Sequence, residues 1–175
     1  MKILFPKLLT SIATAGLAIT SATPALSQTT DMESSTISLT FNQPLFIDIA
    51  NVSPVMIQDP MQNMPASGFD DFCVGGTFGN YGITFTNPMG SAFFLMPTLG
   101  SQPLPYSVIF YSVIGGAGQF ATPGNTLPNN TVQDTMCDPT VLNTRFEVEI
   151  AFADWQGREA EAPFNGTLLI MVEGQ

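Results

Sequence analysis

Three carboxylates beside the single tryptophan come closest in type and spacing to a catalytic arrangement. Asp154, Glu159 and Glu161 fall in one short segment around Trp155, and a pair of carboxylates can hydrolyse a glycosidic bond as general acid and base. The chain has no histidine, and both of its lysines stand near the N-terminus, so serine, cysteine and lysine mechanisms lack a base or a nucleophile. We interpret the segment as a solvated acidic turn and predict that the protein is not an enzyme.

Four aspartates flank the two cysteines in the sequence: Asp70, Asp71, Asp134 and Asp138. A bond between the cysteines would bring these carboxylates into one neighbourhood, and hard oxygen ligands suit calcium. Their spacing matches no calcium-binding loop, however. We therefore interpret them as surface acids and predict neither a metal site nor a cofactor.

The two cysteines, Cys73 and Cys137, both fall in the part of the chain that we expect to be exported, where disulfides persist. We expect them to be bonded to each other, which would stabilise the fold by roughly 4 kcal/mol in the chain-entropy model. The alternative is a pair of free or metal-bound thiols, but the chain offers no histidine or second cysteine pair to complete a zinc site.

The first 27 residues have the three-part form of a secretory signal peptide. A short basic region is followed by an apolar stretch over residues 8–20 and then by small and polar residues. We expect cleavage before Gln28, with cleavage after Ala25 as the alternative. The mature chain would keep two arginines against 14 acidic residues, a formal charge of −12. Such a surface repels nucleic acids and anionic lipid, and no later segment is long and apolar enough for membrane insertion.

The elements that must position these residues are predicted to be β-strands, because no window keeps apolar residues at helical spacing between plausible caps. Strands are expected at residues 81–86, 92–96, 106–114, 131–136, 144–152 and 166–173, and loops at residues 52–65 and 115–130. Short strands at this spacing, separated by Gly, Pro and Asn turn signals, favour an all-β sandwich with Greek-key connections.

An alternating apolar stripe opens the mature chain. It consists of Ile37, Leu39, Phe41, Leu45, Ile47 and Ile49, with Gln43 as the one break. Side chains in a strand point alternately to opposite faces, so a stripe of period two must be buried against something. Pro44 removes a ladder donor, which divides the stripe into an N-terminal extension over residues 28–43 and the first strand of a domain over residues 44–175.

Residues 36–49 resemble the N-terminal segment of chaperone-usher pilus subunits, particularly those of the alternate and archaic branches. Residues 162–172 are similar to the final strand of such subunits, and residues 104–108 are similar to pilin and spore coat protein U domains. Conventional pilins differ from this chain in two ways. They have a short-range disulfide near the N-terminus and a penultimate tyrosine, whereas here the cysteines are far apart and the chain ends in Val172-Glu173-Gly174-Gln175.

The resemblance implies an incomplete immunoglobulin-like sandwich whose missing strand comes from the next subunit, by donor-strand complementation. Ile37, Leu39 and Phe41 would be the donor side chains, whereas Leu45, Ile47 and Ile49 would belong to the subunit's own first strand. Leu168, Ile170 and Val172 would lie on the acceptor-groove strand. The implied function is a structural and sometimes adhesive pilus subunit. Its implied partners are other subunits, a periplasmic chaperone and an outer-membrane usher, and its route leads through the periplasm to the cell surface.

One alternative stays open at this point. The protein could be a self-contained secreted β-sandwich binding module in which the opening stripe pairs within its own chain. In that case Trp155 is the residue best suited to bind a glycan, because its ring is apolar and carries a polar N–H.

Overall fold

The computed structural model describes residues 45–58, 60–100, 102–138, 140–158 and 161–175. All of them fall within one unit of the chain, Phe41–Gln175. The predicted signal peptide, the donor side chains Ile37, Leu39 and Phe41, and Glu159 lie outside the described residues.

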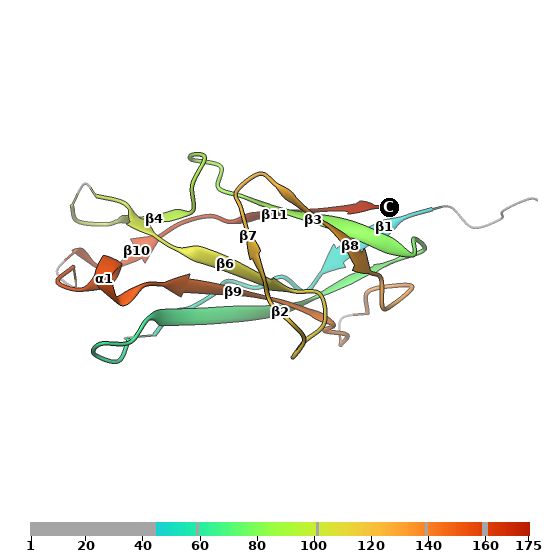
Figure 1. Cartoon of the computed structure of the whole chain (residues 1–175), viewed down its shortest axis with the longest axis horizontal. Coiled ribbons are helices and arrows are strands. Elements are labelled where there is room, and N and C mark those ends of the chain that lie inside the picture. Colours follow the sequence, from blue (N-terminus) through green and yellow to red (C-terminus); the bar gives the residue numbers. More distant parts are fainter. Residues whose placement is uncertain (1–44, 59, 101, 139, 159–160) are drawn as a thin grey trace, which may run out of the picture. The chain divides into compact units, whose positions relative to one another are not determined.

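Short antiparallel strands make up most of the described chain (Figure 1). They are β1 (Ile47–Ala50), β2 (Ala66–Gly76), β3 (Asn80–Thr86), β4 (Phe94–Pro97), β5 (Leu104–Pro105), β6 (Ser107–Tyr111), β7 (Gln119–Ala121), β8 (Thr126–Thr131), β9 (Thr144–Ile150), β10 (Phe164–Asn165) and β11 (Leu169–Gly174). One helical turn, α1 (Phe152–Trp155), follows β9. The prediction of an all-β sandwich is confirmed. Among the described residues no helix is long and apolar enough to cross a membrane.

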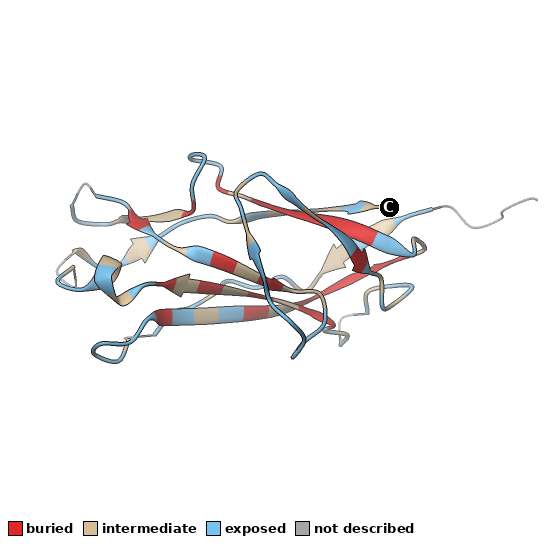
Figure 2. Cartoon of the chain, in the orientation of Figure 1, coloured by how far each residue is buried: buried red, intermediate tan, exposed pale blue. Residues whose placement is uncertain are grey.

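The largest sheet has the strand order β1-β2-β9-β6-β7. Alternation along β9 explains how it packs, because Phe146, Val148 and Ile150 are buried, whereas the charged residues between them are half-buried on the outer face (Figure 2). This is the pattern of an antiparallel strand that has one wet face.

A second sheet has the order β11-β3-β8 and a third, smaller one the order β10-β4-β5. The inward side chains of β3 are completely buried, with Tyr81 at 1% exposure and Ile83 and Phe85 at 0%. Between the sheets, Phe85 packs against Phe110 and Phe146 with ring centroids 5.8 and 6.0 Å apart. The core is therefore an aromatic layer shared by both main sheets.

Two of the predicted elements are wrong. Residues 115–130 were expected to form a loop, but they contain β7 and β8, because pairing with β6 and β3 outweighs the weak strand propensity of this Pro- and Asn-rich segment. The strand expected at residues 131–136 is displaced: β8 ends at Thr131, and the following residues form a loop held against β2.

Candidate functional site: an apolar groove beside the edge of β11

In the described part of the chain, six strands stand at the edge of a sheet and have one side without a partner strand: β1, β7, β10, β5, β11 and β8. β11 pairs with β3 on one side only, and β1 pairs with β2 on one side only. The two strands contact each other across the sandwich, yet no ladder joins them. An unpaired edge presents a row of backbone N–H and C=O groups that can pair with an added strand.

The inward side chains of β11 are incompletely covered. Ile170 and Val172 lie directly opposite Phe85 and Ile83 in the register of β3, and therefore on the same face. The two β3 residues are fully buried, whereas Ile170 and Val172 are only half-buried. Apolar surface is thus left open where the sheet ends at β11.

A wall formed by residues 52–57, which continue the chain beyond β1, faces β11. Val55 and Ile57 turn inward and pack against the core. The wall lies close over β2: a side chain at Gly68 would start 2.8 Å from Cγ1 of Val55 and 3.0 Å from Cγ1 of Ile57. Glycine at this position is what allows the wall to approach the sheet.

A buried carboxylate fixes the wall near its start. The backbone N–H of Ser53 donates to Oδ2 of Asp70 over 2.8 Å. Burial raises the pKa of Asp70, the hydrogen bond from Ser53 lowers it, and the nearby charge of Asp71 raises it, with a net upward shift. The wall is therefore attached to β2 both by packing and by one polar contact.

Between the wall and β11 lies an open cavity of about 420 Å³. Its floor includes the core residues Tyr106, Phe146 and Val148, and its far side includes Leu168 and Ile170. Residues 52–57 all line it on one side, opposite Leu168 and Ile170, so the cavity has the form of a groove. We call it the acceptor groove.

The acceptor groove continues into a second cavity of about 340 Å³, which shares Ile57 and Leu95 with the first. Trp155, Arg158 and Phe164 lie at its end. Nε1 of Trp155 donates to the carbonyl of Met64 over 3.2 Å. This end of the groove is therefore apolar, with its tryptophan N–H already bonded.

Ionic and backbone contacts occupy the guanidinium of Arg158. It donates to Oε2 of Glu161 over 2.7 Å and to the carbonyl of Pro103 over 3.0 Å, and it also contacts the carbonyl of Gln102. The hydrogen bond from Arg158 lowers the pKa of Glu161. Of the carboxylates considered for catalysis, Glu161 is therefore engaged in an ion pair with Arg158.

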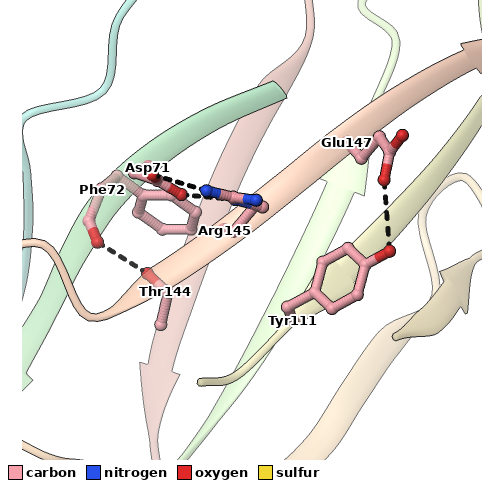
Figure 3. Close-up of polar contacts among 6 residues, drawn as sticks. All are labelled: Asp71, Phe72, Tyr111, Thr144, Arg145 and Glu147. Carbon is pink, nitrogen blue, oxygen red and sulfur yellow. Dashed lines mark hydrogen bonds and ion pairs between the residues drawn. The ribbon is translucent and has the colours of Figure 1, made fainter. Parts of the chain in front are cut away.

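The outer face of the large sheet is different in character (Figure 3). Arg145 forms two hydrogen bonds with Asp71, of 2.6 and 2.8 Å, and its guanidinium lies 3.9 Å from the ring centroid of Phe69. The hydroxyl of Tyr111 donates to Oε2 of Glu147 over 3.2 Å. Hydrogen bonding to Asp71 raises the pKa of Arg145. Several polar groups on this face pair with one another, whereas Phe69 and Phe120 remain 56% and 70% exposed.

The aspartates near the cysteines each have a separate partner. Asp70 accepts from Ser53, Asp71 from Arg145, Asp134 from Asn143 and Asp138 from Thr140. Among the described residues no group of three or more potential ligands could hold a metal ion.

The disulfide expected from the sequence is present between Cys73 and Cys137. Of the residues predicted to lie on an acceptor strand, Leu168 and Ile170 line the groove, whereas Val172 packs on the core beyond it. The loop predicted at residues 52–65 is confirmed among the described residues, which contain no strand there. The sequence did not show that part of this loop lines the groove. The alternation of Val55 and Ile57 was the one local signal.

No protein-family model and no curated protein sequence matches the chain. Among solved structures, the chain is similar to one in a study titled "Chaperone-tip adhesin complex is vital for synergistic activation of CFA/I fimbriae biogenesis". The TM-score is 0.50 at 17% sequence identity, and the match covers 74% of this chain but only 42% of the other. At this identity the likeness establishes the fold, which is of a fimbrial type.

Proposed function

We propose that this protein is a structural subunit of a surface pilus or fimbria, and that its acceptor groove receives an extended strand from a neighbouring subunit. The observation that carries the proposal is the unpaired edge of β11, whose inward side chains are half-buried beside an apolar groove. A strand added there gains main-chain hydrogen bonds along its length and pockets for alternate side chains.

The extension over residues 28–43 of a second copy is the proposed occupant. Ile37, Leu39 and Phe41 are spaced two apart, so they project to one face of a strand and would enter the groove together. Each side chain that becomes fully buried contributes roughly 1.5 to 3 kcal/mol. Burial of these three side chains and the hydrogen bonds of the strand would together act against the entropy that association costs.

The position of β1 favours a neighbour's extension over the chain's own. Phe46, just before β1, is hydrogen bonded to Thr77 at the end of β2, whereas the wall packs over Gly68 near the other end. The described chain therefore begins beside Gly76, at the opposite end of β2 from the wall, so the extension of a second copy is the proposed occupant.

The fimbrial-type fold supports the wider role, with export by the signal peptide and assembly at the cell surface. The similar chain comes from a study of a chaperone–tip adhesin complex. By analogy, a periplasmic chaperone and an outer-membrane usher are the proposed partners during assembly. A chaperone would cover the apolar groove until a subunit strand replaces it.

The test compares two double variants of the mature chain, residues 28–175. Leu39→Asp with Phe41→Asp places charge on the proposed buried face of the extension. Ser38→Asp with Thr40→Asp adds the same charge to the opposite face and is the matched control. We expect wild type and control to form a ladder of oligomers in size-exclusion chromatography with light scattering, and the first variant to remain monomeric.

Two results would contradict the proposal. Equal assembly of both double variants would exclude these side chains as the donor set. A wild-type protein that stays monomeric at high concentration, with a thermal stability independent of dilution, would favour the self-contained module instead.

A further inference from the structure

Asn51 stands at the bend where the chain leaves β1 and begins the wall. Its backbone φ is +66°, a left-handed conformation that asparagine adopts more readily than other non-glycine residues. Its side-chain Nδ2 donates to the carbonyls of Asp138 and Val141, over 3.2 and 3.3 Å. One side chain therefore connects the wall to a segment about ninety positions away in sequence.

The partner segment is the loop between β8 and β9, which is firmly attached to β2. Cys137 is bonded to Cys73, and the N–H of Gly76 donates to the carbonyl of Asp134 over 2.9 Å. A side chain at Gly75 would start 2.9 Å from the backbone nitrogen of Cys137, so the loop lies directly on the strand. This loop is a fixed anchor.

Asn143 adds a buried polar connection at the end of the loop. Its Oδ1 accepts from the N–H of Val74 over 3.0 Å, and its Nδ2 donates to Oδ2 of Asp134 over 2.8 Å. The disulfide is therefore one of several contacts that hold the loop in place.

The wall itself has fewer attachments. Among the described residues, no strand pairs with residues 52–57. Their fixed points are the hydrogen bonds of Asn51 and Ser53 at the start and the packing of Val55 and Ile57 further along. The position of the wall relative to β11 therefore depends strongly on the bend at Asn51.

We propose that Asn51 is a positioning residue of the acceptor groove: its amide ties the wall to the disulfide-anchored loop and keeps the groove at the width that an incoming strand needs. The inference rests on the proposed function for the strand, but the attachment of the wall can be measured without it. The loss of each of the two hydrogen bonds of Asn51 is expected to change the equilibrium constant for attachment of the wall by a few-fold.

Asn51→Gly tests the contribution of the side chain alone, because glycine keeps the left-handed backbone conformation and lacks the side-chain amide. The matched control is Asn129→Gly. Asn129 also has a positive φ, of 61°, and is exposed on β8; its backbone N–H donates to Oε1 of Gln175 over 2.9 Å, a contact that glycine keeps. Asn51→Asp is a third variant. It keeps the shape of the side chain, but its carboxylate oxygens cannot donate hydrogen bonds to the carbonyls of Asp138 and Val141.

Hydrogen exchange of the Ser53 amide, which donates to Asp70, reports on the attachment of the wall in the mature chain. We expect exchange about ten-fold faster in Asn51→Gly and Asn51→Asp than in wild type, with no change in Asn129→Gly. Equal exchange in Asn51→Gly and wild type overturns the inference, whether or not the protein assembles.

Assembly is the second readout. If wild type forms oligomers, their dissociation constant is expected to rise about ten-fold in Asn51→Gly and to stay unchanged in Asn129→Gly. Faster exchange at the wall with unchanged assembly would overturn the positioning role. A wild type that does not assemble contradicts the proposed function, and exchange at the wall then decides the inference alone.

Discussion

Asp70 is a buried acid whose ionisation state matters for the fold. Because its pKa is raised in the folded protein, mainly by burial, the folded state binds this proton more tightly than the unfolded state. Stability attributable to Asp70 is therefore fully present below the ordinary aspartate pKa, and it is lost as the pH rises through the raised value. Asp70→Asn keeps an oxygen acceptor for Ser53 and should remove this part of the pH dependence, which chemical denaturation at a series of pH values would measure.

Asp138 offers a control of opposite sign. Hydrogen bonds from the backbone and side chain of Thr140 lower its pKa, so its contribution is present above the ordinary pKa and is lost as the pH falls through the lowered value. Asp138→Asn should therefore leave the Asp70 dependence intact. If the free energy of unfolding changes with pH equally in wild type and in Asp70→Asn, other acids cause the pH dependence.

Gly68, beneath the wall, is expected to tolerate alanine poorly. The added methyl group would lie 2.8 Å from Cγ1 of Val55, so the wall would have to move. Overpacking of this kind costs about 1 to 3 kcal/mol. Gly79→Ala is the control, because nothing lies within 4 Å of a Cβ there. Equal free energies of unfolding for the two variants would contradict this prediction and would mean that the wall moves to accept the methyl group at no cost in stability.

At the level of elements, the disulfide-anchored loop is expected to contribute strongly to stability. The bond closes a sequence separation of 64 residues, and in the chain-entropy model its loss lowers the free energy of unfolding by about 4 kcal/mol. The double variant Cys73→Ala with Cys137→Ala should show this decrease in denaturant titrations. Addition of a dithiol reductant to the wild type should produce a similar decrease, and a loss below about 1 kcal/mol would show that the other loop contacts suffice.

Strands with a local signature could be predicted from the sequence. The alternation of Phe146, Val148 and Ile150 identified β9, and Tyr81, Ile83 and Phe85 identified β3, because burial on one face leaves a period of two in the residues themselves. The pairing of Cys73 with Cys137 followed from their number and the expected compartment.

The wall and the anchored loop could not be predicted in the same way. Pro54 and Pro60 indicate a loop, and the order of the wall depends on Gly68 and Asp70, which lie on another strand. Likewise Asp134 and Cys137 are held by β2, and this overrides the apparent strand pattern at residues 131–136. Contacts between distant segments decide these elements, and a single sequence does not display them.

On the scale of the whole molecule, charge plays a small part in the proposed assembly. Arg145 and Arg158, which remain after the expected cleavage, are each engaged in an ion pair within the subunit. Acidic subunits repel one another, so apolar burial and backbone hydrogen bonds must supply the attraction. The groove provides both, since its lining is apolar and the edge of β11 beside it is unpaired.

The start of β1 and the acceptor groove lie at different places on the domain, since Phe46 is hydrogen bonded near Gly76 whereas the wall packs over Gly68. In the proposed contact, each subunit donates its extension at one site and receives a strand at a different site. Such a contact is heterologous, unlike the symmetric contact of a two-fold dimer. Where the rotation between successive subunits does not close a ring, repetition would produce a filament with two chemically different ends. One terminal subunit would keep an empty groove, and the other an unused strand.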